Sequence, residues 1–479
     1  MAAEQKISYR NLYLSVFIIN IVYLGVGESN VWTSPAIPRL KEEGSKFAGT
    51  SFNEAWLVSC FAIGQVLGPL ISGCFMDTLG RKPTTFLIIL FMVISCSMLA
   101  VASTVEILYL ARIIGGFSFG MSVSVLPVYV AELSDPAVRG TLNSFPLASR
   151  SLGYFLMYAV GPIVSYMNLI LVTIVAPVIA LLLIFLLPES PYHLFAKGKS
   201  ESAHQTVTWL RRGATKEAIQ AEVDTMQKAV EEIKANKKSF RTLISTRASI
   251  RALYISCGLL FFLQMSGIPV IMSITESLFI LARVNISTKL CTLIFGGLML
   301  TVGLLGPAVT RRFGFKTPLT ISAFGMFLSL SVFGGHFYMI SLGYDMSDYS
   351  LVPLSSLVAY ISFFSLGFSN SAFAVVGELF APNIKALGTS LTNCIGFACA
   401  LLSIQLYYVI KSTFGIHFGI WSFALTNALA VPFTIFFVPN TSGMSLLEIQ
   451  EMLNKPWFDK KNKVVPIEER YTMREVCYI

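Results

Sequence analysis

The chain has 479 residues, of which 54% are apolar and 13% are charged, and its formal net charge is +9. Soluble domains carry about 25% charged residues, so this composition excludes an ordinary soluble globular protein. The positive charge gathers between long apolar runs, and we therefore expect no nucleic-acid partner. The eight cysteines include no CxxC pair, and the four histidines show no ligand spacing. We expect no metal, cofactor or disulfide framework.

Long apolar runs recur along the whole chain, many of them close to the ~20 residues that cross a bilayer core. We predict an all-α polytopic membrane protein with twelve transmembrane helices. The predicted spans lie near 12–33, 55–76, 84–103, 107–131, 142–164, 168–187, 251–275, 289–309, 317–341, 353–380, 386–410 and 417–438.

The basic residues are distributed unevenly between the two sides of the predicted helices. With both termini in the cytosol, 27 of the 35 Lys and Arg residues fall on the cytosolic side, six on the other side and two inside spans. This asymmetry follows the positive-inside rule. We predict a multi-pass protein of the plasma membrane with cytosolic termini, whose immediate partner is the lipid bilayer.

One polar stretch interrupts the hydrophobic pattern and divides six spans from six. Its mixed charges at helical spacing predict short amphipathic helices in a cytosolic linker. The predicted organisation is an N-terminal six-helix half over 1–187, the linker over 188–250, a C-terminal half over 251–438 and a cytosolic tail over 439–479.

Two short segments recur in the two halves. AELSDPAVRG at 131–140 returns as GELFAPNIKA at 377–386, each copy at the end of the fourth span of its half. GCFMDTLGRKPT at 73–84 is echoed by TRRFGFKTP at 310–318. Two related six-helix halves are typical of transporters that bind solute near the repeat interface.

The motifs resemble those of the sugar porters of the major facilitator superfamily, and most closely the animal (insect-type) facilitated trehalose transporters. The resemblance covers nearly the whole chain, which looks like a diverged member. It rests on Gly73-x-x-x-Asp77-x-x-Gly80-Arg81-Lys82, Arg112-Ile-Ile-Gly115, Pro127-Val-Tyr-Val-Ala-Glu132, Pro188-Glu189-Ser190-Pro191, Ser266-Gly267-Ile268 and Trp32-Thr33-Ser34-Pro35-Ala36. It implies the major facilitator fold and a facilitative transporter, not an enzyme, that carries a sugar such as trehalose or a hexose by alternating access.

The resemblance also implies a set of gating salt bridges that hold the cytosolic helix ends together in the outward-facing state. The alternative is that these charges only anchor the topology. The residues are Asp77, Arg81, Lys82, Glu132, Arg139, Glu189, Glu378 and Lys385. Four departures from the family pattern weaken the set: Tyr192 and Phe315 replace arginines, Arg311 replaces an acid, and Asn440 replaces a glutamate.

The residues at the expected sugar-contact positions differ more from the family pattern than the predicted gating residues do. Leu147, Leu263, Pro269 and Gly396 stand where sugar porters place amides, although the trehalose branch also lacks the first of these. Buried sugar hydroxyls need directional partners, because unpaired ones cost kilocalories. The candidate substrate-binding residues are Gln264, Asn370, Ser371 and Phe373. A non-sugar solute, or a non-transporting nutrient sensor on the same fold, are the alternatives.

Glu28 and Arg150 are charges that the spans least expect, and we predict an intramembrane pair between them, because a lone charge there costs at least ~2.5–3.5 kcal/mol. In the alternatives, Arg150 faces substrate or a broken-helix carbonyl, or Glu28 reaches outer water. Ser29 stands where proton-coupled porters have Asp, so proton coupling stays open. Asn285-Ile-Ser287 is a glycosylation sequon in a predicted outside loop.

Overall fold

A computed structural model describes most of the chain. The described residues are 8–43, 45, 47, 52–135, 138, 140, 142, 144–235, 243–381, 384–444 and 446–455. The chain divides into two compact units, Met1–Lys237 and Lys238–Ile479. Apart from one isolated bridge between Ser8 and Arg212, the regular secondary structure of the described part is helical.

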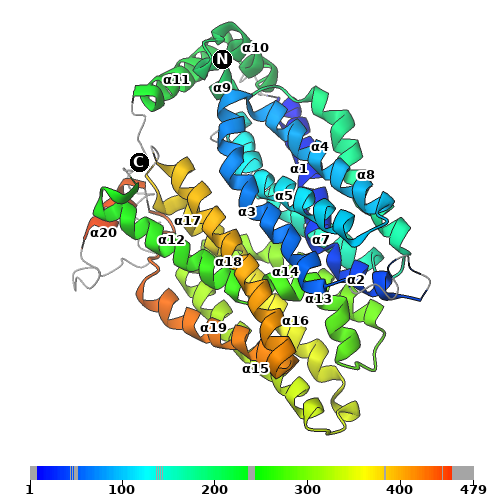
Figure 1. The fold of residues 1–479 in the computed structure, drawn as a ribbon. Helices are drawn as coiled ribbons and strands as arrows, with labels where there is room; N and C mark the ends of the chain where they lie inside the picture. Colours follow the sequence, from blue (N-terminus) through cyan, green and yellow to red (C-terminus); the bar gives the residue numbers. More distant parts are fainter. Residues whose placement is uncertain are drawn as a thin grey trace. The chain divides into compact units, whose positions relative to one another are not determined.

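The first unit packs long helices beside one another and ends in short polar helices (Figure 1). Its helices are α1 (Arg10–Val31), α2 (Thr33–Lys41), α3 (Glu54–Thr78), α4 (Arg81–Val101), α5 (Val105–Leu133), α7 (Phe145–Val160), α8 (Tyr166–Leu183), α9 (Pro191–Ala196), α10 (Ser200–Leu210) and α11 (Lys216–Ala235). The last three lie at the end of the unit where α4 begins and α5 ends, which we call the linker end (Figure 1).

The second unit repeats the long-helix pattern, with two of its predicted spans broken. Its helices are α12 (Arg247–Met265), α13 (Ile268–Leu281), α14 (Thr288–Phe313), α15 (Lys316–Ser341), α16 (Leu351–Leu366), α17 (Phe368–Leu379), α18 (Lys385–Phe414), α19 (Ile416–Phe436) and α20 (Leu446–Asn454). The breaks fall at Ser266–Gly267 and at Gly367, so the seventh and tenth predicted spans are each a pair of helices.

The predicted spans correspond closely to the observed helices. Eleven segments of the described chain are long and apolar enough to cross a membrane. The remaining predicted span, the fifth, is α7, which has 16 helical residues. Helices α9, α10 and α11, which we call the linker helices, fall within the predicted linker. Their facing sides form a small apolar core that includes Phe195, Val207 and Val223.

Glycines allow close helix contacts in the first unit. A Cβ on Gly27 of α1 would overlap the carbonyl oxygen of Arg150 in α7, and a Cβ on Gly153 would overlap that of Leu24. Gly64, Gly68, Gly116 and Gly120 bring the backbones of α3 and α5 together in the same way. Close approach of this kind is how membrane helices gain van der Waals contact where lipid supplies no hydrophobic driving force.

We predict that Gly153→Ala destabilises the protein, because its new Cβ meets backbone, which cannot rotate away. Overpacking of this kind costs about 1–3 kcal/mol and should lower Tm by several degrees. The matched control is Gly335→Ala in α15, where an added Cβ meets nothing within 4 Å. That change should hold or raise Tm, since Ala is the better helix former. Equal Tm values for the two variants in detergent would contradict the close crossing.

Candidate functional site: the charge cluster and the broken helices

The turn between α3 and α4 places a carboxylate against a helix N-terminus. Gly80 has φ +107°, and a Cβ there would lie 2.5 Å from Glu189 Oε2, so the turn requires glycine for both its conformation and its space. The Arg81 amide donates to Glu189 Oε1 at 2.8 Å, and the Lys82 amide donates to Oε2 at 3.2 Å. A carboxylate in this position satisfies free N–H groups and complements the helix dipole.

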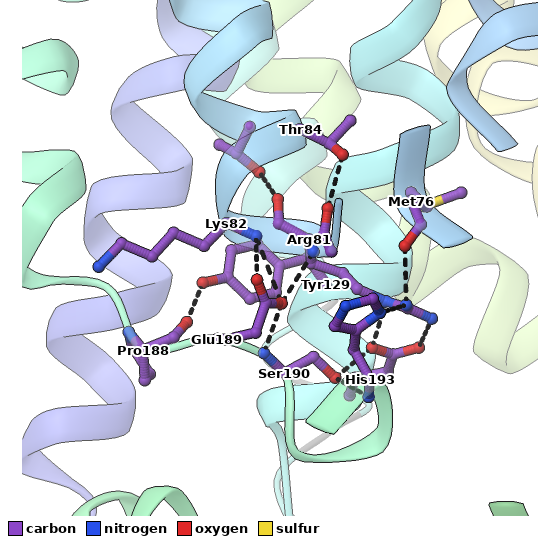
Figure 2. Close-up of polar contacts among 12 residues, drawn as sticks. Met76, Arg81, Lys82, Thr84, Tyr129, Pro188, Glu189, Ser190 and His193 are labelled. Carbon is purple, nitrogen blue, oxygen red and sulfur yellow. Dashed lines mark hydrogen bonds and ion pairs between the residues drawn. The ribbon is translucent and has the colours of Figure 1, made fainter. Parts of the chain in front are cut away.

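The Arg81 side chain forms the central ion pair of the linker end (Figure 2). Its Nη2 donates to Glu132 Oε1 at 2.8 Å, and its Nε lies 2.8 Å from Oε2. The side chains are 14% and 16% exposed, so water screens the pair only in part. The Ser190 hydroxyl donates to Glu132 as well. We call Arg81, Lys82, Glu132, Glu189, Ser190 and His193 the Arg81 cluster.

His193 also contacts Arg81. The sequence analysis did not select this histidine, because it found no ligand spacing among the four histidines. Arg81 Nη1 lies 3.0 Å from His193 Nδ1 (Figure 2). Burial, and next the Arg81 guanidinium, lower the pKa of His193 below its ordinary value of 6.5. Its place three residues after Ser190 is the feature of the sequence that could have indicated this role, because the Ser190 hydroxyl accepts a hydrogen bond from the His193 amide.

Lys82 and Asp77, two other predicted gating residues, take no part in the ion pair of Arg81 and Glu132. Lys82 Nζ donates to the carbonyl of Phe185 at 3.1 Å. Asp77 is exposed at the end of α3, and Arg139 falls outside the described residues. Tyr192, which replaces an expected arginine, packs on the apolar core of the linker helices.

A second buried arginine ties the linker helices to the end of α5. Arg211 is 2% exposed, and its guanidinium donates to both oxygens of Glu222, at 2.8 and 3.2 Å. Its Nη1 donates to the Leu133 carbonyl at 3.1 Å, and its Nε lies 3.5 Å from Asp135 Oδ2. Arg211 therefore ties the linker helices to the end of α5 by a hydrogen bond and a charge contact.

The second unit reproduces this geometry with an amide in place of one carboxylate and a phenylalanine in place of the arginine. Gly314 has φ +71°, and Asn440 Oδ1 accepts the Phe315 amide at 3.2 Å, in the role that Glu189 has in the first unit. Thr441 donates to Glu378 at 2.7 Å, as Ser190 does to Glu132. Among the described residues no ion pair joins Glu378 to a base, and Lys385 is exposed. Phe315 occupies the place of Arg81.

Glu28 and Arg150 come from helices that do pack together, α1 and α7. Within the described residues their side chains form no ion pair in this conformation, and Glu28 Oε2 and Arg150 Nε have no hydrogen-bond partner. Their pairing stays a prediction. A third charge within the spans, Arg112, does have partners. Its Nη1 donates to the Ser29 carbonyl at 2.9 Å, and its Cζ lies 4.1 Å from the ring centre of Phe61.

Three polar side chains that the sequence analysis did not select meet inside the first unit. Asn30 of α1 donates to the Tyr154 hydroxyl of α7 at 3.3 Å. Gln65 of α3 donates to Asn30 Oδ1 at 3.5 Å. Two amides and a phenol on three separate predicted spans give no local motif, so only the packing reveals them.

The break between α12 and α13 lies beside Gln264, the first candidate for substrate contact. Gly267 has φ +96°, and the Ser266 carbonyl accepts from Asn427 at 3.1 Å and from Tyr360 at 3.3 Å. These donors replace the helical hydrogen bonds that the break removes. Gln264 is 9% exposed, and among the described residues its side chain does not bond to the backbone at the break.

The candidates on the tenth span are positioned differently. The Asn370 side-chain amide donates to the carbonyls of Ser365 at 2.9 Å and Gly303 at 3.3 Å, so it repairs the break at Gly367 and joins α17 to α14. Ser371 is fully buried, and Phe373 is half-buried. Asn285 is exposed and donates to the Ser347 carbonyl at 3.2 Å. The described residues contain no group of three acidic, histidine or cysteine side chains that could hold a metal.

Two comparisons connect this geometry to known proteins. The family model described as "Sugar (and other) transporter" matches residues 28–453. The solved structure of the xylose transporter XylE from E. coli in an inward open conformation superposes with a TM-score of 0.76 at 20% identity, over 92% of this chain and 99% of that chain. The fold is therefore that of the major facilitator superfamily, a class of membrane transporters and not of enzymes.

The chain belongs to the sugar (and other) transporter family of that superfamily. A "Facilitated trehalose transporter Tret1" of Aedes aegypti is 29% identical over 92% of this chain. A "Facilitated trehalose transporter Tret1-2 homolog" of Drosophila sechellia is 30% identical over 92% of this chain and 90% of its own length. The chain spans only 55% of the length of the Aedes relative.

We predict that Phe315→Arg adds the base that the second unit lacks. A guanidinium at the position equivalent to Arg81 should pair with Glu378 and contribute about 1 kcal/mol, which raises Tm by a few degrees. The control is the same change combined with Glu378→Gln, which removes the carboxylate and should cancel the gain. An equal rise in Tm in both backgrounds would show that no ion pair forms.

Proposed function

We propose that this chain is a facilitative transporter of a sugar, trehalose or a hexose, that works by alternating access in the plasma membrane. The helix break at Ser266–Gly267 beside Gln264 is the observation that carries the proposal. Irregular backbone at membrane depth occurs where it is buried in protein or lines a cavity, and transporters place solute sites at such breaks. Gln264 supplies both a donor and an acceptor at the break, as a hydroxyl-rich solute requires.

We also propose that the linker end faces the cytosol and that the Arg81 cluster stabilises the outward-facing state. The clustering of basic residues on that side supports the orientation. The half-buried ion pair of Arg81 and Glu132 supports the second point, because such a pair is costly to break once made. A change of about 1.4 kcal/mol shifts a two-state ratio tenfold, so one such contact suffices to bias the states.

A non-sugar solute is the second candidate, and one observation favours it. Asn370 uses its side-chain N–H groups on backbone carbonyls, and Ser371 is fully buried. If the tenth span supplies no amide donor, the polar contacts available to a sugar in the second unit are few. A smaller or less hydroxylated solute would then be the better fit.

Uptake into proteoliposomes of purified full-length chain decides between these candidates. We expect saturable uptake of labelled trehalose or glucose that stops when the internal and external concentrations are equal, with no accumulation driven by a pH gradient. A panel of polyols, amino acids and organic acids runs in parallel. Saturable uptake of one of these and of no sugar would replace the first proposal by the second.

Gln264→Ala tests the solute contact, and we expect it to raise the half-saturation constant by about 10-fold, because one polar contact to solute is worth roughly 1.4 kcal/mol. Asn370→Ala is the comparison variant. Since Asn370 repairs the backbone, its loss should lower Tm more than it changes the half-saturation constant. Unchanged kinetics in well-folded Gln264→Ala protein would remove this residue from the solute site.

The gating proposal predicts that Arg81→Ala shifts the resting population towards the inward-facing state. A cysteine at position 264, in a chain whose native cysteines are replaced by serine, reports the state through its reaction with a membrane-impermeant thiol reagent. Arg81→Ala should speed labelling from the linker end several-fold. Glu378→Ala should act in the same direction but less, because Glu378 carries a Thr441 hydroxyl in place of an arginine. Unaltered labelling from both sides would refute the gating role.

A further inference from the structure

The hydrogen bond between Arg81 and His193 fixes the protonation state of the imidazole. An arginine guanidinium has N–H donors and no acceptor, so the His193 Nδ1 that lies 3.0 Å from Arg81 Nη1 must carry a lone pair. The imidazole is then neutral, with its proton on Nε2. A proton on Nδ1 would replace the hydrogen bond by two like charges in contact.

The residues around the imidazole leave it little room to move away from the Arg81 guanidinium. His193 is 6% exposed, and a Cβ built on Gly80 would lie 3.1 Å from His193 Cδ2. Its own amide bonds to the Ser190 hydroxyl, which in turn donates to Glu132. The charges that act on the ring are those of Asp77 of α3, Arg81 of α4, and Lys197 and Lys199 after α9. Glu132 of α5 and Glu189 of the segment before α9 bond to Arg81 and to Ser190.

We propose that His193 is a positioning residue for Arg81, and that protonation of its ring weakens the Arg81–Glu132 ion pair and so makes the cluster sensitive to pH on the linker side. The neutral ring holds one edge of the guanidinium while Glu132 holds another. The imidazolium repels that guanidinium and competes for the same carboxylate. Its effect on transport rests on the proposed function, whereas the chemistry of the cluster does not.

The direction of the effect follows from linkage. Burial and the Arg81 charge lower the pKa of His193 in the intact cluster below its ordinary value of 6.5. Release of the cluster relieves both influences, so we expect the pKa to rise towards that ordinary value. The intact cluster therefore binds fewer protons than the released one. Its stabilisation is fully present above about pH 6.5 and is lost as the pH falls from there through the lowered pKa.

Nitrogen NMR of the full chain, labelled with ¹⁵N-histidine, tests the chemistry without any transport. The chain has four histidines, and His193→Gln identifies the His193 signals by their loss. We expect a neutral ring with an unprotonated Nδ1 at neutral pH and a titration midpoint below 6.5. A protonated Nδ1, or a midpoint at or above 6.5, would overturn the proposal.

Uptake at varied pH on the linker side, with the opposite side held constant, tests the consequence. We expect the wild-type rate to change at least about two-fold between about pH 7.5 and pH 5.5, and His193→Gln to abolish this dependence. His204→Gln, on α10 at the same end, is the matched control and should keep the wild-type response. A pH response that survives in His193→Gln would overturn the proposal. A wild-type chain that transports no sugar would count against the proposed function and leave the NMR result valid.

Discussion

The structure depends on one constraint: in lipid, every backbone N–H and C=O must find a partner within the protein. Continuous helices meet this constraint alone, whereas each break needs a side chain. Asn427 and Tyr360 bond to the Ser266 carbonyl, and Asn370 bonds to the carbonyl of Ser365. At the membrane edge, Glu189 and Asn440 accept the first amides of α4 and of the turn before α15. These polar side chains therefore form hydrogen bonds with backbone groups, whether or not they also contact a solute.

The two units meet the same demand with different chemistry. The first unit uses two carboxylates and an arginine, so its contacts are ionic and directional. The second uses an amide, a hydroxyl and one carboxylate without an arginine. Ionic contacts in a partly buried site are costly to break once formed, while neutral hydrogen bonds exchange with water at a net cost of about 1 kcal/mol. We therefore expect the contacts around the α3–α4 turn of the first unit to be harder to break than those around the α14–α15 turn of the second.

Local patterns in the sequence were enough to predict the helical class and the positions of the long apolar helices. The length of apolar runs and the distribution of basic residues can be read from the local sequence, so they require no knowledge of tertiary contacts. The role of Glu189 could be suspected from its motif, but its bonds to the Arg81 and Lys82 amides depend on a turn about a hundred residues away. Asn370 stays a predicted solute contact, and its bonds to the carbonyls of Ser365 and Gly303 depend on packing that no local sequence pattern records.

The glycine contacts in the first unit also determine which pieces can move. Where Gly27 meets Gly153, and where four glycines join α3 to α5, backbone touches backbone with no side chain between. A side-chain interface can slide by changing rotamers, but a backbone interface has no rotamers to change. In each of these pairs one helix must carry the other. If the helices of this unit move, we expect each of these two pairs to move as one body.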